Sequence, residues 1–174
     1  MFFIKNIIIF LCLSAMLFTG MKDKNIEKVI IPSDSIRFRI ISNSDSSIDI
    51  NEKMILKSIM EKIIFDLIKD VKSSKEVDEI IVNNFEFINE NISKYLGHNN
   101  YKLDYGKNYF PKKIYNGVVY NEGYYDSLVI TLGNGKGKNW WCVLFPPLCL
   151  LDENKTTNDV EYQFFVSRII NKFK

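Results

Sequence analysis

The spacing of apolar residues changes between a strand period and a helical period along this chain, and this order of periods limits the fold more than any other feature. Between residues 49 and 95 the apolar side chains recur at three- and four-residue steps, the spacing of amphipathic helices. From residue 99 onward they alternate with polar residues, the pattern of half-buried strands. An alternating segment also stands before the helical region, at residues 36–41. The order of strand, helices and strands predicts an α+β fold.

Two helices are predicted in the middle of the chain, and the short joint between them favours an antiparallel pair packed on a sheet. The first covers residues 49–72, with its start at Ser47 or Asp49, and places Lys53, Lys57, Glu61, Asp66 and Lys69 on its polar face. The second opens at Ser73-Ser74-Lys75-Glu76, a Ser-x-x-Glu capping box, and continues to residue 96. Gly97 is then expected to end the helix in the left-handed backbone conformation.

The predicted sheet is mostly antiparallel and begins with the N-terminal strand at residues 36–41. Later strands are expected at residues 101–105, 118–120, 124–132 and 140–145. Asn116-Gly117 is typical of a tight hairpin turn. A short amphipathic helix at residues 162–173 ends the chain.

The first twenty residues are a targeting element. Lys5 is their one charge, and an apolar stretch follows from Ile7 to Phe18, which suits a secretory signal. Phe18 stands where a signal peptidase favours a small residue, so residues 1–20 are either a cleaved signal peptide or an N-terminal anchor in contact with the membrane. The near absence of charge disfavours a buried helix of a cytosolic protein. Residues 21–35 form a linker, and residues 36–174 form a single domain.

Charge and histidine content exclude several classes of function. The 23 basic and 21 acidic residues give a net charge of +2, too balanced for a protein that chiefly neutralises nucleic-acid phosphates. His98 is the one histidine, which excludes a His-rich zinc site, and no metal-ligand spacing occurs. The sequence therefore predicts no nucleic acid, no metal and no cofactor.

The segment Gly133-Asn134-Gly135-Lys136-Gly137-Lys138 has the composition of a phosphate-binding loop but not its spacing. A P-loop places four residues between its first glycine and a Gly-Lys-Ser/Thr triplet. Here three residues separate Gly133 from Gly137, and Asn139 follows Lys138. The segment is therefore predicted to be a turn between two strands.

Cys142 and Cys149 are the cysteines outside the targeting element, and export permits their oxidation. Pro146-Pro147 bends the chain between them. Closing so short a loop stabilises the fold by about 2.5 kcal/mol in the chain-entropy model. A disulfide and a pair of small buried thiols both remain open, whereas a catalytic thiol is disfavoured because His98 is its one available imidazole.

An aromatic cluster marks a candidate binding surface. Trp140, Trp141 and Phe145 share one predicted strand, and Tyr124 lies in a neighbouring strand. Adjacent tryptophans in a strand point to opposite faces, so one enters the core and the other meets water, another element or a partner. Exposed tryptophan is a favoured interface anchor. Coverage of that ring by a helix of the same chain is the competing interpretation.

Carboxylates offer an enzymatic alternative. Asp45 and Asp49 stand at the start of the first predicted helix, where a glycosidase-like pair of acid and base would need two nearby carboxyl groups. Helix capping and interaction with the helix dipole account for the same residues. The sequence thus identifies no catalytic residue, and a septal peptidoglycan hydrolase using Asp45 and Asp49 is the rival hypothesis. A structural septal protein held by an uncleaved anchor is a third.

Several segments together resemble the stage II sporulation protein R family of endospore-forming bacteria. They are Ile36-Arg37-Phe38-Arg39-Ile40-Ile41-Ser42-Asn43-Ser44-Asp45-Ser46, Phe110-Pro111 with Tyr115, Gly123-Tyr124, and the long run from Leu132 to Cys149 that contains Gly133-Asn134-Gly135-Lys136-Gly137-Lys138-Asn139-Trp140-Trp141-Cys142 and Phe145-Pro146-Pro147. The resemblance covers about residues 30–152.

This resemblance implies a non-catalytic signalling protein without a small-molecule substrate. Members of the family are made in the forespore and exported into the space between the two septal membranes. There they activate a membrane-embedded aspartic protease of the mother cell, which processes pro-sigma-E. For this chain the expected partner is therefore such a protease, contacted on its extracytoplasmic side, with Trp140, Trp141, Phe145 and Tyr124 as candidate contact residues.

Overall fold

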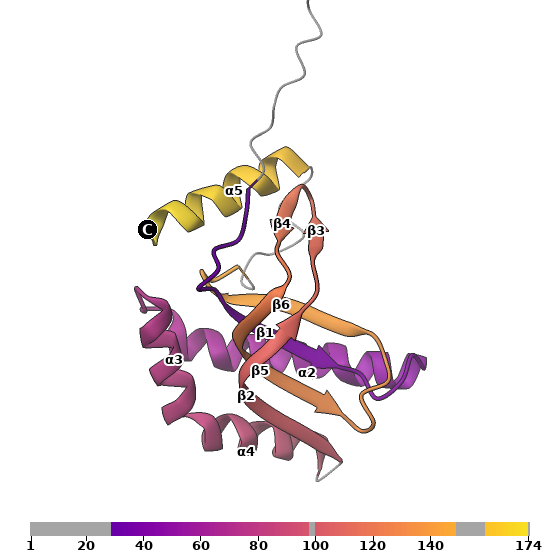
Figure 1. Ribbon diagram of the computed structural model, residues 1–174. Coiled ribbons are helices and arrows are strands. Elements are labelled where there is room, and N and C mark those ends of the chain that lie inside the picture. Colours follow the sequence, from indigo (N-terminus) through magenta and orange to yellow (C-terminus); the bar gives the residue numbers. More distant parts are fainter. Residues whose placement is uncertain (1–28, 98–99, 149–158, 174) are drawn as a thin grey trace, which may run out of the picture.

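The computed structural model describes residues 29–97, 100–148 and 159–173 (Figure 1). Its elements confirm the predicted α+β class. In chain order they are β1 (Ile36–Ile41), α2 (Ser47–Ile68), α3 (Ser74–Asn83), α4 (Phe85–Leu96), β2 (Tyr101–Phe110), β3 (Lys113–Tyr115), β4 (Val118–Tyr120), β5 (Gly123–Leu132), β6 (Asn139–Phe145) and α5 (Asp159–Lys172).

The main sheet has four strands in the order β2-β5-β1-β6. β1 pairs with β5 in parallel and with β6 antiparallel, while β2 pairs with β5 antiparallel. The N-terminal strand therefore lies between β5 and β6, although these two follow each other in the sequence. The predicted turn at residues 133–138 does connect two strands, but it passes over the end of β1 instead of closing a hairpin.

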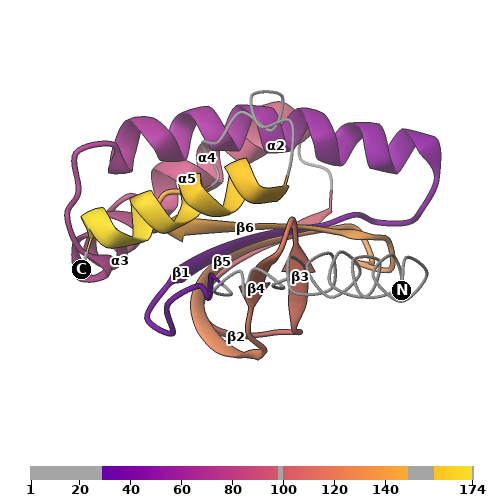
Figure 2. The same ribbon diagram turned by 90° about the horizontal axis from the view of Figure 1, so that it is seen from above.

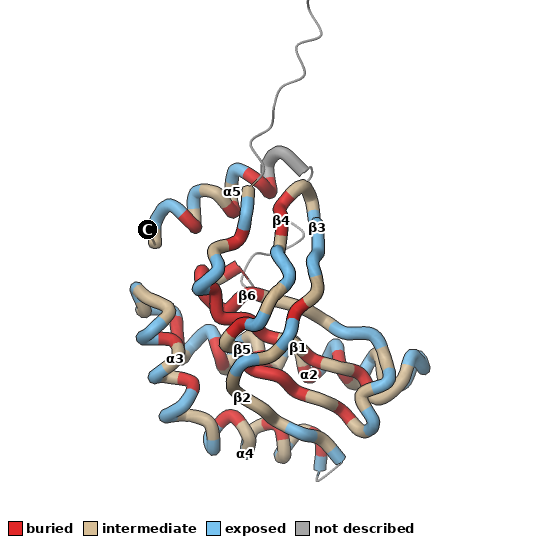
Figure 3. Tube along the Cα trace, in the orientation of Figure 1, coloured by how far each residue is buried: buried red, intermediate tan, exposed pale blue. Residues whose placement is uncertain are grey.

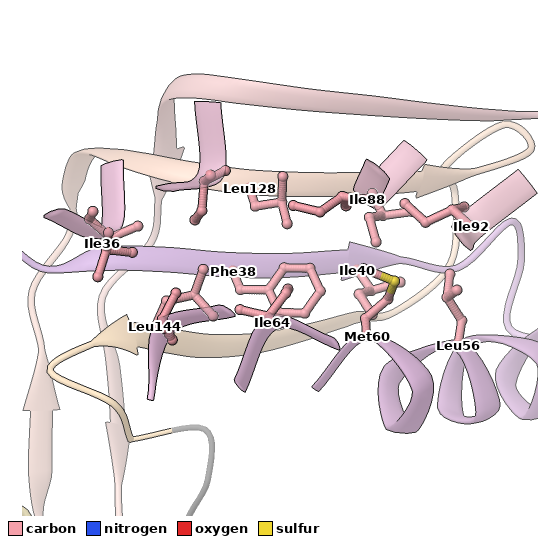
Figure 4. Packing of buried hydrophobic residues seen from close by; sticks show 14 of the residues in the cluster. Ile36, Phe38, Ile40, Leu56, Met60, Ile64, Ile88, Ile92, Leu128 and Leu144 are labelled. Atoms are coloured by element: carbon pink, nitrogen blue, oxygen red, sulfur yellow. The ribbon is translucent and has the colours of Figure 1, made fainter. Parts of the chain in front are cut away.

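Helices α2, α3 and α4 form one layer against the main sheet (Figure 2). Their arrangement follows from β1, whose side chains alternate between the two faces. Phe38 and Ile40 are fully buried and point toward Met60 and Ile64 of α2 (Figure 4). Figure 3 shows buried residues concentrated along β1, β5 and β6 and on the inward sides of the helices. The sheet therefore has one face covered by helices α2–α4, and we call the opposite one the second face.

A serine side chain caps the start of α2 and of α3. The Ser46 hydroxyl accepts a hydrogen bond from the Asp49 backbone N–H at 3.1 Å and begins α2. The Ser73 hydroxyl accepts from the Glu76 N–H at 3.2 Å, so the predicted capping box is present. Gly97 ends α4 in the left-handed conformation, with φ 61°.

The second predicted helix is divided in two, and the prediction of one continuous helix was wrong. The break lies at Asn84, which ends α3 and precedes α4. Its side-chain amide donates to the Ile80 carbonyl at 2.8 Å, beside the backbone N–H of Asn84, which donates to the same oxygen at 3.0 Å. Asparagine competes with the helix backbone in this way, which explains its low helix propensity.

A second hydrophobic cluster lies beside the main core and joins distant parts of the chain. Val118 of the β3–β4 hairpin, Val143 of β6 and Val166 of α5 belong to it. The predicted Asn116-Gly117 turn is confirmed, because both residues have positive φ, 46° and 75°. The segment before β1 runs along this hairpin: the Ile31 N–H donates to the Val119 carbonyl at 3.0 Å, and the Val119 N–H donates to the Val29 carbonyl at 2.8 Å. Residues 29–31 of the predicted linker therefore pack against the domain.

The targeting element lies outside the described residues, and its fate stays a prediction. Within the described ranges no helix combines the length and apolar character that a membrane crossing requires.

Replacing Phe38 tests the central position of β1. Phe38→Ala leaves a cavity where a fully buried ring packs under α2, and we expect the free energy of unfolding to fall by about 3–5 kcal/mol in urea titrations. Ile48→Ala is the matched control, because this side chain is 80% exposed, and its effect should stay within about 0.5 kcal/mol. Similar losses for the two variants would contradict the assignment of β1 to the core.

Candidate partner-binding face of the sheet

The two adjacent tryptophans point to opposite faces of the sheet, as predicted. Trp140 lies on the face covered by α2–α4, with its ring edge-on to Phe38 at 5.3 Å and the Lys57 ammonium 5.3 Å from its ring centre. Trp141 lies on the second face and contacts Phe110 edge-on at 5.2 Å. Both rings are half-buried. Trp140 therefore belongs to the edge of the core, and Trp141 is the tryptophan of the second face.

The structure does not bring all four predicted contact residues together. Phe145 is 5% exposed and packs edge-on against Phe173 at 4.9 Å, which makes it a core residue. Tyr124 is 71% exposed and pairs with Tyr109 at 5.6 Å. By strand alternation Tyr124 shares a face with Leu128, whereas Trp141 lies on the opposite one.

Around Trp141 the second face carries a stack that the sequence analysis missed. Two arginines of β1 alternate with aromatic rings of three other strands, in the order Tyr125, Arg37, Phe110, Arg39, Trp141. Arg37 lies 3.5 Å from the centre of the Tyr125 ring and 5.4 Å from that of Phe110. Arg39 lies 5.4 Å from the Phe110 ring centre and 5.1 Å from that of Trp141. We call these five residues the arginine–aromatic stack.

Burial changes the electrostatics of both arginines. Arg37 is 3% exposed, and desolvation lowers its pKa, while Tyr125 and Tyr120 act in the opposite direction. Desolvation also lowers the pKa of Arg39, which is half-buried. Aromatic faces stabilise such cations through the ring quadrupole, by up to about 2 kcal/mol where water is excluded. The alternating Arg37 and Arg39 were visible in the sequence, but their burial depends on the sheet order.

A second feature, at the end of β1, joins two turns that are far apart in the sequence. The turn at residues 42–46 receives backbone hydrogen bonds from the turn at residues 133–138, and we call this pair of turns the loop clasp. Gly137 N–H donates to the Ser42 carbonyl at 2.9 Å, and Lys136 N–H donates to the Asn43 carbonyl at 3.1 Å. The Asp45 carboxylate accepts from the Lys138 N–H at 2.7 Å. The glycine-rich segment therefore fastens the β5–β6 connection over β1.

Glycine is required where the two turns touch. A Cβ atom at Gly137 would overlap the Ser44 carbonyl and lie 2.7 Å from the Ser42 Cβ. Gly133 has φ 52°, and a Cβ there would meet the Asn43 side chain. This packing, and not phosphate binding, accounts for the glycines of the segment.

Asp49 is held inside the clasp by hydrogen bonds. Its carboxylate accepts from the Ser44 hydroxyl and, at 3.0 Å, from the Asn43 amide. These donors, led by Ser44, lower the pKa of Asp49. A general acid at neutral pH needs the opposite shift. Asp45 and Asp49 thus have structural partners in the clasp, which weighs against the rival hydrolase mechanism.

Lys53 departs from the prediction that it lies on the polar face of the first helix. It is 5% exposed, and its ammonium donates to the Lys138 carbonyl at 2.7 Å. Burial lowers the pKa of Lys53, with Asp45 acting in the opposite direction. The clasp covers this turn of α2, so Lys53 is buried although the helical pattern assigns it to the polar face. A helical period alone does not contain that information.

The two candidate cysteines are described unequally. Cys142 is half-buried on β6 and is disulfide-bonded. Cys149 lies outside the described residues, so its pairing with Cys142 stays a prediction. Among the described residues no group of three or more His, Cys, Asp or Glu side chains is placed to hold a metal ion.

Comparison with known proteins identifies the family of this chain. The family model described as stage II sporulation protein R matches residues 32–155, a range that contains the whole main sheet, the loop clasp and the arginine–aromatic stack. The stage II sporulation protein R of Bacillus subtilis (strain 168) is 40% identical over 155 residues, which cover 84% of this chain and 69% of that protein. The chain belongs to the stage II sporulation protein R family. Membership in this family supports a role in sporulation. No solved structure matches the chain.

The lowered pKa of Asp49 makes a prediction about acid stability. A carboxylate whose pKa is lower in the folded state stabilises the protein above the unfolded value of 3.8, and this contribution is lost as the pH falls through the folded pKa. Asp49→Asn should therefore lower the urea midpoint at pH 7, and the difference from wild type should shrink below pH 3.8. Asp66→Asn, on the exposed face of α2, is the control. If the urea midpoints of Asp49→Asn and wild type differ by the same amount at pH 7 and below pH 3.8, this role is contradicted.

The loop clasp predicts strong sensitivity at one glycine. Gly137→Ala should lower the free energy of unfolding by about 1–3 kcal/mol, because the new methyl group forces the two turns apart. Gly97→Ala separates the two possible costs, since Gly97 has a left-handed backbone with open space around a new methyl group, whereas Gly137 has no positive φ and lacks that space. Urea titration of both variants measures the comparison. An equal or smaller loss at Gly137 would show that the contact between the turns is dispensable.

Proposed function

We propose that this chain is an exported, non-catalytic signal that activates a membrane-embedded aspartic protease, which then cleaves pro-sigma-E. The observation that carries the proposal is membership in the stage II sporulation protein R family over residues 32–155. The signal passes from the forespore to the mother cell. Contact occurs on the extracytoplasmic side of the protease.

The second face of the sheet supports this proposal because it offers a stiff, partly exposed binding surface. Trp141 is half-buried there, next to Phe110 and Arg39. Tryptophan and arginine are the residues that most often dominate interface energies. They also lie on strands, which hold side chains more firmly than loops do. A surface of this kind suits recognition of a protein.

Activation is a shift between two states of the protease. The chain binds the active arrangement more tightly than the resting one and so increases its population. Moving such an equilibrium from about 1:99 to about 99:1 needs about 5.5 kcal/mol of differential binding. A few aromatic and charged contacts on the second face are of the right magnitude.

Export is the remaining part of the proposal. Residues 1–20 deliver the chain to the space between the septal membranes, where they are either removed or kept as an anchor. N-terminal sequencing of the exported form distinguishes these two fates.

Co-expression in a non-sporulating host tests the proposal directly. The full chain, the protease and pro-sigma-E are produced together, and cleavage is followed by immunoblotting. Cleavage should require the chain and should stop when the catalytic aspartate of the protease is replaced. Equal cleavage with and without the chain would contradict the proposal.

Trp141→Ala examines the proposed surface in the same assay. We expect processing to fall at least about tenfold, because a central aromatic anchor contributes 2 kcal/mol or more. Phe87→Ala is the control, since this ring is 48% exposed on α4, which covers the opposite face of the sheet. Urea titration shows whether each variant is folded. A folded Trp141→Ala protein with full processing would exclude this residue as the anchor.

The hydrolase hypothesis has its own test. Purified full-length chain is incubated with septal peptidoglycan, and release of soluble fragments is measured. Turnover that is abolished by Asp45→Asn would replace the signalling proposal with an enzymatic one.

A further inference from the structure

The arginine–aromatic stack contains hydrogen-bond donors without acceptors. Arg37 Nη2 and Arg39 Nε are buried and have no hydrogen-bond partner among the described residues. Arg37 Nε donates to the Ser35 hydroxyl at 3.4 Å, and Arg39 Nη1 donates to the Tyr109 carbonyl at 3.5 Å. Both distances are long for N–H···O bonds. The two guanidinium groups therefore make fewer and longer hydrogen bonds than buried polar groups usually do.

No carboxylate in the described part of the chain neutralises these arginines by an ion pair. The pairs found there are Lys57–Glu61, Lys75–Glu79 and Lys107–Asp126. Buried or half-buried arginine normally has an acidic partner or a full set of acceptors. Two cations two residues apart on one strand also reinforce each other's positive potential. This part of the second face therefore favours the binding of a negatively charged group.

The neighbouring rings determine how that group approaches. Phe110 and Trp141 both lie against the guanidinium of Arg39, while its donors lie in the guanidinium plane. Arg39 is half-buried, whereas Arg37 is almost completely enclosed. Arg39 is therefore the accessible member of the stack, and Arg37 holds Phe110 from its other side.

We propose that Arg39, held between Phe110 and Trp141, binds the carboxylate of an acidic side chain on the protein partner. This inference rests on the proposed function and specifies its contact: an Asp or Glu flanked by apolar residues on the extracytoplasmic part of the protease. A carboxylate matches the planar fork of arginine with two parallel hydrogen bonds. The aromatic rings beside it provide the apolar part of the contact.

The observations favour a carboxylate over the phosphates of a lipid surface. Binding to anionic lipid headgroups uses clusters of about four to eight basic residues. This chain has a net charge of only +2, and its second face presents one accessible arginine within an aromatic surround. Such a site suits one acidic side chain better than a charged membrane.

The test uses the full chain, the protease and pro-sigma-E in the co-expression assay. Arg39→Gln should lower processing about tenfold or more, since charge-assisted hydrogen bonds are lost. Lys62→Gln removes an equal charge from an exposed position on α2, on the opposite side of the sheet, and should leave processing unchanged. Failure of the wild-type chain to trigger cleavage would refute the proposed function itself. Wild-type activity together with full activity of folded Arg39→Gln would overturn only this inference.

A second variant covers the case in which Arg39→Gln does not fold. Arg39→Lys keeps the charge and the aliphatic stem but lacks the planar fork, so a folded Arg39→Lys protein should also lose processing. Undiminished processing by that variant would overturn the inference.

Charge exchange identifies the occupant. Arg39→Glu is combined with single Asp/Glu→Arg replacements along the extracytoplasmic segments of the protease. Recovery of processing with one replacement supports the carboxylate contact, and recovery with none overturns it. Vesicles of phosphatidylglycerol and of phosphatidylcholine test the lipid alternative. Arg39-dependent binding to the former, with processing unaffected by Arg39→Gln, would also overturn the inference.

Discussion

The insertion of β1 between β5 and β6 is the constraint on which the rest of the structure depends. It gives the sheet its central strand and sends alternate residues of one short segment to two different environments. Phe38 and Ile40 complete the core under α2, while Arg37 and Arg39 reach the second face. One segment of alternating sequence therefore serves both the stability of the fold and its candidate binding surface.

The insertion also explains the composition of the two turns at the end of β1. Because β5 and β6 are not neighbours, their connection has to cross β1, and it is fixed there by hydrogen bonds to residues 42–45. Backbone atoms approach so closely that Gly137 has no room for a side chain. The small polar residues of the turn at 42–46 supply the caps and acceptors. What resembled a ligand-binding loop is a structural fastening.

Local features of the fold could be predicted from the sequence, and features that depend on distant contacts could not. The capping box at Ser73, the stop at Gly97 and the turn at Asn116 depend on neighbouring residues and were predicted correctly. The buried Lys53 and the stack of Arg37 and Arg39 depend on the strand order, which periodicity does not specify. The break at Asn84 is local, but a continuous apolar stripe concealed it.

The central claim is that the second face of the sheet binds the partner. Hydroxyl-radical footprinting of the chain, free and in complex with the protease, measures the exposure of individual side chains and tests this claim most directly. Oxidation of Trp141 should fall in the complex, while Phe87, which is 48% exposed on α4, should react as in the free chain. Unchanged oxidation of Trp141 together with protection of Phe87 would place the interface elsewhere and contradict the account.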